Sequence, residues 1–397
     1  MYPTLSDILR DLFGIKISLP IQSFGMMMAT SFIVAAWLLM KELKRKEADG
    51  TLKPTEKKVL KGKPASISEL LISGAIGFIV GFKLIGIVIN YTAFSNNPQT
   101  FIFSSQGTWV GGFLMMGLSI FLRYREKEKE RKNPPVWETE IVHPYQLTGN
   151  IILLGALFGI LGAKIFHNLE NIDEFIKDPV DAIFSFSGLT YYGGLIMAAI
   201  AIIYFVGKYK IKPLTISDIA APSIMSGYGI GRIGCQLAGD GDWGIVNTAP
   251  KPNWMSFLPD WMWSFKYPHN VINEGIKIPG CDGKHCFELA QAVYPTPIYE
   301  TLMCLGIVLI LWILRKRLKT PGVLFSIFLI LTGLERFLIE TIRVNNKFNV
   351  AGISFTQAEL ISVVLILIGL FGIWYLQFRK PKKIAENESG ENLQPGT

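Results

Sequence analysis

Arg232 lies in a glycine-rich segment that follows an apolar run and reads Gly-Tyr-Gly-Ile-Gly-Arg-Ile-Gly over residues 227 to 234. Glycines leave part of a helix surface bare, so that another helix or a lipid can approach the backbone. An arginine at the centre of a membrane helix costs about 2.5–3.5 kcal/mol on insertion scales. Because membrane proteins rarely tolerate that cost without a use for the charge, we predict that this segment carries the chemistry.

Three other stretches place aromatic, glycine and charged residues at the ends of apolar runs: residues 190 to 195, 294 to 300 and 333 to 343. In the last of these, Arg336, Glu340 and Arg343 follow at spacings of four and three, which predicts that they share one face of a helix. Arginine presents a planar fork that matches phosphate, so several arginines near the external leaflet would suit a phospholipid headgroup. Alternatively, Arg336 and Glu340 form an ion pair that ties helices together.

The composition indicates a membrane protein. The chain has 397 residues, of which 50% are hydrophobic and 18% are charged, and its mean hydropathy is +0.35. Its apolar runs have the length of membrane-spanning helices, about 20 residues, rather than the roughly 10 residues of β-barrel strands. The formal charge of +8 comes from lysines and arginines gathered in loops, which favours membrane orientation over nucleic-acid binding. We therefore predict an all-α, polytopic membrane protein that binds no nucleic acid.

About nine apolar runs are predicted to span the membrane: residues 21 to 41, 68 to 90, 108 to 123, 147 to 169, 188 to 207, 215 to 237, 297 to 314, 322 to 343 and 356 to 378. Basic residues are concentrated after the first, third, fifth, seventh and ninth runs. Because loops rich in lysine and arginine stay in the cytoplasm, we expect the N-terminus outside and the C-terminus in the cytoplasm. Residues 238 to 296 then form one large external loop.

An internal repeat is visible at an offset of 81 residues. The matched positions are Gly74, Ala75, Ile79, Gly81, Lys83, Asn90, Pro98, Ile102, Phe103, Ser104 and Gly107, which recur as Gly155, Ala156, Ile160, Gly162, Lys164, Asn171, Pro179, Ile183, Phe184, Ser185 and Gly188. After a one-residue slip, Gly111 and Gly112 recur as Gly193 and Gly194. This pattern predicts a parallel repeat of two helices. The alternative is chance similarity between small-residue membrane helices, which the paired Lys, Asn and Pro positions disfavour.

The four chemistry-bearing stretches resemble the prolipoprotein diacylglyceryl transferase family. Its members carry Gly-Arg-(Leu/Ile)-Gly-Asn followed by Gly-Glu and Trp-Gly, a His-Gly-Gly-Leu element, a His-Pro-Ser-Gln-Leu-Tyr-Glu element and a late Arg-x3-Glu-x2-Arg helix. The resemblance covers residues 147 to 378, in the same order and spacing. It implies an enzyme of the bacterial cytoplasmic (inner) membrane that moves a diacylglyceryl group from phosphatidylglycerol to the lipobox cysteine thiol of a prolipoprotein, the first step of lipoprotein maturation.

The resemblance also implies which residues carry this reaction. The implied catalytic residues are Arg232, Arg336, Arg343 and Tyr192. The implied substrate-binding residues are Arg232, Gly244, Asp240, Tyr299, Glu300, Glu340, Gly193 and Gly194, with Asp218 in support. The implied partners are phosphatidylglycerol, the signal peptide with its lipobox cysteine, and membrane lipids. Neither a cofactor nor a metal is implied.

The chain departs from the family pattern at several positions. Tyr192 stands where the family has histidine before Gly-Gly, Cys235 replaces the asparagine, Tyr294 replaces the second histidine, and Phe24 stands where tyrosine is usual. A tyrosine with a pKa of about 10 is a poor base, so a positioning hydrogen bond is the expected role of Tyr192. A thiol with a pKa of about 8.5 ionises appreciably near neutrality, so a weak base would suffice. The group that takes the thiol proton is left open.

The resemblance and the loop charges together predict four parts of the chain. Residues 1 to 20 form an external amphipathic N-terminal segment without the features of a cleaved signal peptide, so that insertion relies on the first span. Residues 21 to 146 hold the first span, the duplicated helix pair and cytoplasmic loops. Residues 147 to 378 form the transferase core with the external loop 238 to 296, and residues 379 to 397 form a cytoplasmic tail.

The external loop holds two further patterns, each with two interpretations. Cys281 and Cys286 could form a disulfide, or with His285 they could bind a metal; two further ligands at zinc-like spacing are missing, which favours the disulfide. Trp254, Trp261, Trp263 and Tyr267 indicate an arm that lies on the membrane surface, or alternatively a small folded cap.

Two rival functions remain from the sequence. The parallel repeat and the intramembrane charges are also typical of a transporter for lipids or anionic solutes. A catalytically inactive relative that acts as a scaffold for lipoprotein processing is the other rival. Only a transferase forms a thioether, so the chemical product separates the three functions.

Overall fold

Nine long helices dominate the computed structural model, which describes residues 1–17, 19–96, 101–102, 104–132, 134–184, 190–345, 347–350 and 353–378. They are α2 (Ser23–Ala48), α3 (Ile67–Ile89), α6 (Trp109–Lys129), α7 (Thr148–Glu170), α10 (Tyr191–Gly207), α11 (Pro213–Ala238), α12 (Thr296–Leu314), α13 (Val323–Glu340) and α14 (Gln357–Phe378). Each helix overlaps one of the apolar runs found in the sequence. The predicted tail, residues 379 to 397, lies outside the described residues.

Within these described ranges, five helices are long and apolar enough to cross a membrane, namely α2, α3, α7, α12 and α14. This composition, in a mostly helical chain, is that of a multi-pass membrane protein. Of the other four long helices, α10 has 17 residues, α6 ends in a run of charged residues, and α11 and α13 carry buried acidic groups, among them Asp218 and Glu335. Such charges in an apolar helix are expected to face the interior of the bundle.

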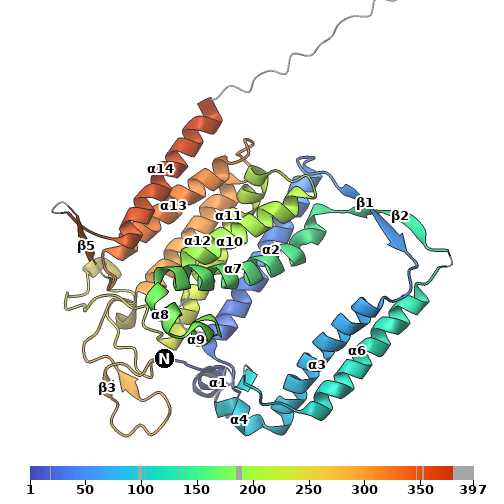
Figure 1. Cartoon of the computed structure of the whole chain (residues 1–397). Coiled ribbons are helices and arrows are strands. Elements are labelled where there is room, and N and C mark those ends of the chain that lie inside the picture. Colours follow the sequence, from blue (N-terminus) through green and yellow to red (C-terminus); the bar gives the residue numbers. More distant parts are fainter. Residues whose placement is uncertain are drawn as a thin grey trace, which may run out of the picture.

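The core of the molecule is built around α11, which packs against α2 on one side and α12 on the other (Figure 1). Close backbone approach depends on glycine: a Cβ on Gly229 would lie 2.7 Å from Cys304 Cβ, and one on Gly234 would lie 3.1 Å from Met27 Cβ. Cys304 is fully buried at this contact, where small residues allow close helix packing. Helix α13 packs against α14, and α7 packs against α10.

Helices α3 and α6 pack on each other and stand apart from the main bundle in Figure 1. Strands β1 (Thr55–Lys61) and β2 (Val136–Val142) connect the pair to the bundle and form an antiparallel ribbon. The prediction of an all-α fold is therefore wrong in this respect, since the described part of the chain also contains three two-stranded sheets. Charged side chains pair across the ribbon, where Lys61 Nζ lies 3.3 Å from Glu138 Oε2.

The remaining elements are short. They are α1 (Leu5–Phe13), α4 (Tyr91–Asn96), η1 (Pro144–Leu147), α8 (Ile172–Lys177), α9 (Pro179–Phe184), η2 (Asn253–Met255), η3 (Asp260–Met262), β3 (Ile276–Lys277), β4 (Phe287–Glu288), β5 (Lys347–Val350) and β6 (Ile353–Thr356). Helix α1 begins with a capping box in which the Thr4 hydroxyl accepts from the Asp7 amide at 3.3 Å. The N-terminal segment is fixed to the end of α11, because the Tyr2 amide donates to the Leu237 carbonyl at 3.0 Å.

The loop between α11 and α12 folds as a cap with its own small core. Tyr267 is fully buried with Trp243, Leu289 and Val293, and its hydroxyl donates to Gln236 Oε1 at 2.7 Å. The prediction of an interfacial arm is wrong for Tyr267, because hydrogen bonding and ring packing draw it into this core. Trp254, by contrast, is 71% exposed.

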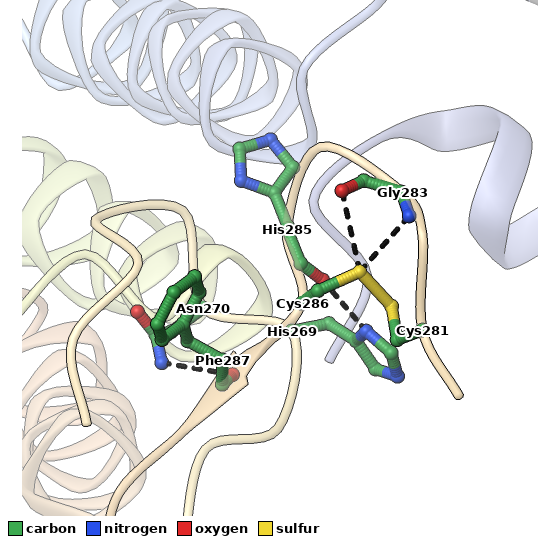
Figure 2. The surroundings of a disulfide bond; sticks show 7 residues. All are labelled: His269, Asn270, Cys281, Gly283, His285, Cys286 and Phe287. Atoms are coloured by element: carbon green, nitrogen blue, oxygen red, sulfur yellow. Dashed lines mark hydrogen bonds between the residues drawn. A yellow bond between two sulfur atoms is a disulfide. The ribbon is translucent and has the colours of Figure 1, made fainter. Parts of the chain in front are cut away.

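A disulfide joins Cys281 to Cys286 in this loop, as Figure 2 shows. Of the two interpretations of these cysteines, the disulfide is confirmed. The His269 ring binds the His285 carbonyl through Nδ1 at 2.7 Å. Asn270, which is fully buried, donates to the Phe287 carbonyl at 3.1 Å. These bonds hold the strand pair β3–β4 against the rest of the loop.

Candidate functional site

Two arginines and two carboxylates meet where α11, α12 and the end of α13 converge. Arg232 Nε lies 2.5 Å from Glu300 Oε2, and Arg232 Nη1 pairs with Asp242 Oδ2. Arg343 donates from Nη1 to Glu300 Oε1 at 2.9 Å and from Nη2 to Asp242 Oδ1 at 2.7 Å. Each carboxylate therefore binds both guanidinium groups, and the four charges balance.

Tyr228 completes this network one helical turn before Arg232. Its hydroxyl donates to Glu300 Oε2 at 2.7 Å and accepts from Arg232 Nη2 at 3.0 Å. The Arg232 guanidinium also lies over the Tyr228 ring, 4.9 Å from its centroid. The Glu300 side chain is fully buried, whereas 33% of the Asp242 side chain is exposed. The site therefore opens on the side of Asp242.

The backbone at Gly244 brings Arg343 to this place. Helix α11 ends at Ala238, and Gly239 turns the chain with a φ of +65°, in the left-handed region that favours glycine. The chain then returns so that Gly244 bridges to Arg343, and the Ile245 amide donates to the Ile342 carbonyl at 2.8 Å. A Cβ on Gly244 would lie 2.5 Å from that carbonyl oxygen, so only glycine permits the approach.

The two aspartates of this loop have opposite pKa shifts. Burial raises the pKa of the Asp242 carboxyl, but the guanidinium groups of Arg232 and Arg343 outweigh burial and hold that pKa below its ordinary value. Burial raises the pKa of the Asp240 carboxyl, which accepts a hydrogen bond from the Asp242 amide at 3.4 Å. Ligand atoms of Cys235, Asp240 and Asp242 lie within 4.8 Å of one another. The arginines already bind both Asp242 oxygens, so this trio is not free to hold a metal.

Arg336 and Glu340 lie on the last turn of α13 and pair with each other, with Arg336 Nη2 3.2 Å from Glu340 Oε2. Asn345 donates to the other Glu340 oxygen at 2.5 Å. The prediction that Arg343 shares their helix face is wrong, because α13 ends at Glu340 and Arg343 lies in the bridge to Gly244. Arg343 has two carboxylate partners in the folded chain, Asp242 and Glu300.

The other predicted site residues lie in the walls of the site or in helix contacts. Tyr299 donates from its hydroxyl to the Met262 carbonyl at 2.8 Å and so fixes the cap to α12. A Cβ on Gly193 or Gly194 would lie within 2.8 Å of atoms of α7, so this glycine pair serves close helix packing. Asp218 accepts from the backbone amides of Gly322 and Phe325 and caps the start of α13, at the other end of that helix from Arg343.

Tyr192 lies on the first turn of α10 and reaches the site through a neighbour. Its ring centroid is 5.5 Å from that of Tyr191, and the Tyr191 ring is 6.3 Å from that of Tyr228. Three tyrosines thus line the route from α10 to Arg232. Tyr228 and Asp242 were not predicted, although Tyr228 lies one turn from Arg232 on the same helix and Asp242 lies in the same glycine-rich stretch.

These features define a class of protein: a multi-pass membrane protein with a paired-arginine site at one end of a helical bundle, suited to an anion. The chain matches the prolipoprotein diacylglyceryl transferase family over residues 11–152 and 108–375, and it belongs to that family. The two matched segments overlap from 108 to 152, so one part of the chain aligns with two parts of the family pattern.

Several curated relatives are similar to most of the chain. The phosphatidylglycerol–prolipoprotein diacylglyceryl transferase of Lysinibacillus sphaericus is 26% identical over 68% of this chain and 88% of its own length. The protein of the same name from Staphylococcus aureus is 28% identical over 74% of this chain and 92% of its own length. The protein of the same name from Shewanella oneidensis is 26% identical over 72% of this chain and 93% of its own length.

Proposed function

We propose that this protein transfers the diacylglyceryl group of phosphatidylglycerol to the cysteine thiol of a prolipoprotein and releases glycerol phosphate. This transfer is the first step of lipoprotein maturation. The observation that carries the proposal is the pairing of Arg232 and Arg343 through shared carboxylates, in a chain that belongs to this transferase family. The relatives named above support the choice of both substrates.

The reaction exchanges one bond for another at a glyceryl carbon. The cysteine sulfur forms a C–S bond to this carbon, and the C–O bond to the phosphate breaks. The electron pair of the broken bond stays on the phosphate oxygen, so negative charge builds up on the leaving group. Fixed guanidinium groups in a water-poor site stabilise such charge, which is the role we assign to Arg232 and Arg343.

The headgroup competes with Asp242 for these arginines. Both guanidinium groups already bind carboxylates, and a phosphate offers the same paired oxygen acceptors as a carboxylate. Glu300 is fully buried and bound by Tyr228, so it stays in place, whereas Asp242 is partly exposed on a loop with Gly241 at a φ of +98°. We therefore assign phosphate binding to the position of the Asp242 carboxylate.

The other predicted residues shape the surroundings of this position. Gly244 and Asp240 form the loop that faces the headgroup, and Tyr299 fixes the cap that covers it. The Arg336–Glu340 pair marks a second polar surface on α13. Gly193 and Gly194 bring α10 close to α7, which fixes the backbone that presents Tyr192. Tyr192 itself is assigned a positioning hydrogen bond to the substrate.

For the membrane arrangement we infer nine spans, with the N-terminus outside and the C-terminus in the cytoplasm of the inner membrane. The loop charges support this orientation. The N-terminal segment, 1 to 20, bonds to the end of α11 beside the cap, so both lie on one side. Cysteine-accessibility labelling should find loop 238 to 296 external and loop 124 to 146 cytoplasmic. Labelling in the reverse pattern would contradict the orientation and the assignment of the site to the outer leaflet.

The helix pair α3–α6, within residues 21 to 146, is inferred to be a duplicate of α7–α10 in the same orientation. Matching contacts support it: a Cβ on Gly81 would lie 2.3 Å from the Gly111 carbonyl oxygen, and one on Gly162 would lie 2.5 Å from that of Gly193. The residue before each second helix also bonds back to the first helix of its pair. The Thr108 amide donates to the Phe82 carbonyl and the Thr190 amide to the Ala163 carbonyl, at 3.0 and 3.1 Å.

Helix ends agree with the same offset. Asn90 follows the end of α3 and Asn171 follows the end of α7. Of the matched positions, Pro98, Phe103, Ser185 and Gly188 lie outside the described residues. An experimental structure in which Lys83 superposes on Lys164 would support the duplication, and dissimilar packing of the two pairs would contradict it.

Mass spectrometry of a lipobox peptide tests the transferase function directly. The purified protein is incubated with the peptide and with micelles that contain phosphatidylglycerol. We expect a mass increase of one diacylglyceryl group on the cysteine, and none on a matched peptide with serine in its place. Complementation of a bacterium depleted of its own transferase is the cellular test. Lipid movement without thioether formation would instead favour the transporter function.

A further inference from the structure

Glu335 is a buried carboxyl group that the reaction described so far does not use. It lies on α13 directly before Arg336, and only 3% of the residue is exposed. Its Oε1 atom has no hydrogen-bond partner among the described residues. A buried polar atom without a partner is costly, and natural proteins satisfy most such atoms. An unpaired acidic oxygen held inside an apolar helix therefore indicates a function.

The helix contacts place Glu335 at the level of Tyr228. One turn earlier on α13, the Thr332 hydroxyl lies 3.7 Å from the Met225 sulfur on α11. Helices α11 and α13 run in the same direction, because the segments that follow them meet in the Gly244–Arg343 bridge. Glu335 on α13 and Tyr228 on α11 each lie three residues beyond this contact, which is about 4.5 Å further along each helix. Tyr228 binds both Glu300 and Arg232, so Glu335 lies just inside the paired-arginine site.

Charged and titratable groups from three neighbouring helices face Glu335. The charges that act on it are those of Glu300 on α12, Arg232 on α11, Arg336 beside it and Arg343 beyond α13. The Glu335 carboxyl also interacts electrostatically with four other side chains, namely Tyr191 and Tyr192 of α10, Tyr228 of α11 and Cys304 of α12. Glu335 is therefore close enough to the tyrosines that lead to Arg232 to interact with them electrostatically.

The other acidic groups near the site are already bound. Glu300 and Asp242 accept from both arginines. Glu340 pairs with Arg336 and accepts from Asn345. A carboxylate whose oxygens are held by guanidinium groups is a weak base, because the positive charge favours its ionised form. Glu340 Oε2 also lacks a hydrogen bond, but the Arg336 guanidinium lies 3.2 Å from it. Of these carboxyl groups, Glu335 is thus the one with an oxygen held by neither a hydrogen bond nor an ion pair.

We propose that Glu335 is the general base that accepts the proton of the lipobox cysteine thiol. The inference depends on the proposed function and on the site at Arg232 and Arg343. The thiol proton moves to Glu335 Oε1 as the sulfur electron pair forms the C–S bond. The C–O electron pair leaves with glycerol phosphate, which takes up a proton from water or from Glu335. Every atom and charge in this step is then accounted for without a further reactant.

The test compares Glu335→Gln and Glu335→Asp variants on two lipobox peptides, one with cysteine and one with selenocysteine. A selenol is already ionised near neutral pH, so it needs no base. We expect Glu335→Gln to lower transfer to the cysteine peptide by about 10²-fold, the scale of a lost general base. Transfer to the selenocysteine peptide should fall less than about fivefold, and Glu335→Asp should keep the wild-type shape of the pH–rate profile.

The cysteine peptide should also recover in the Glu335→Gln variant as the pH rises through the thiol pKa of about 8.5. Near-wild-type activity of Glu335→Gln, or an equal loss with both peptides, would overturn the proposal. Glu130→Gln, an exposed change on the opposite side of the membrane, is the control for expression and assay. If wild-type protein forms no thioether, the proposed function fails; if it does and Glu335→Gln matches it, only this inference fails.

Discussion

Arg232 and Arg343 bind the same two carboxylates although they lie far apart in the sequence. Asp242 and Glu300 each reach both guanidinium groups, so neither arginine can move without disturbing the other. Both arginines are mostly buried, with side-chain exposures of 13% and 12%. Two fixed guanidinium groups at one position are suited to bind a phosphate, whose oxygens can accept hydrogen bonds from both at once.

The arginine pair gives the first prediction. Arg232→Lys and Arg343→Lys should each lower diacylglyceryl transfer by about 10²-fold or more, the scale of losing one oriented donor. Lysine keeps the charge but loses the fork, so the protein should still insert and express. The measurement is transfer to a lipobox peptide by purified variants. Arg123→Lys, a partly exposed change on α6 whose guanidinium pairs with Glu126, should retain wild-type activity. Near-normal activity in both site variants would rule out the headgroup assignment.

Asp242→Asn is expected to strengthen lipid binding. The wild-type carboxylate competes with phosphate for the arginines, and removing its charge should lower the KM for phosphatidylglycerol by about tenfold, the scale of a close charge pair. The arginines lower the pKa of the Asp242 carboxyl. Their contact with the ionised carboxylate therefore stabilises the folded protein at pH values above the ordinary carboxyl pKa of about 3.9. This stabilisation is lost as the pH falls through the pKa that Asp242 has in the folded protein. An unchanged or raised KM would contradict the competition.

Glu300→Gln should have the opposite effect. Glu300 is fully buried and binds Tyr228 and both arginines, so its removal leaves two buried positive charges with one partner fewer. Breaking a buried ion pair from one side typically costs about 3–5 kcal/mol. We therefore expect a clearly lower thermal unfolding temperature in detergent together with loss of transfer. An unfolding temperature equal to that of wild type would show that Glu300 does not support the arginines.

Gly244→Ala tests the backbone bridge. The new Cβ would lie 2.5 Å from the Ile342 carbonyl oxygen and 2.9 Å from Thr296 Cγ2. Such overpacking costs about 1–3 kcal/mol, and it would push Arg343 away from Asp242. We expect at least a tenfold loss of transfer, on the logic that a 1 Å misplacement costs about 10²-fold. Gly306→Ala in α12 meets no atom within 4 Å and is the matched control. Equal activity of the two variants would contradict this account.

The sequence was sufficient for the helices and for part of the candidate site. Long apolar runs have few alternatives to helices in a membrane, so all nine predicted runs coincide with helices of the folded chain. Arg232, Glu300 and Gly244 could be predicted because each lies in a motif whose order and spacing are distinctive.

Other relationships depend on how distant segments meet. The spacing of Arg336, Glu340 and Arg343 suits a helix, but α13 stops at Glu340 because the following residues bridge to Gly244. Asp242 joins two arginines only because the fold places Arg343 beside it. Tyr267 resembles an interfacial aromatic in sequence and is buried only because the loop folds on itself. None of these contacts is local, so periodicity and composition could not indicate them.

Tyr192→Phe separates a positioning role from a proton-handling role. Tyr192 reaches Arg232 through the rings of Tyr191 and Tyr228. If Glu335 takes the thiol proton, loss of the Tyr192 hydroxyl removes one neutral hydrogen bond, worth about 0.5–1.5 kcal/mol. We expect transfer to fall less than about tenfold, with an unchanged pH–rate profile. Tyr204→Phe, on the exposed side of α10, should match wild type. A loss as large as that of the arginine variants, with an altered pH profile, would assign the proton to Tyr192 instead.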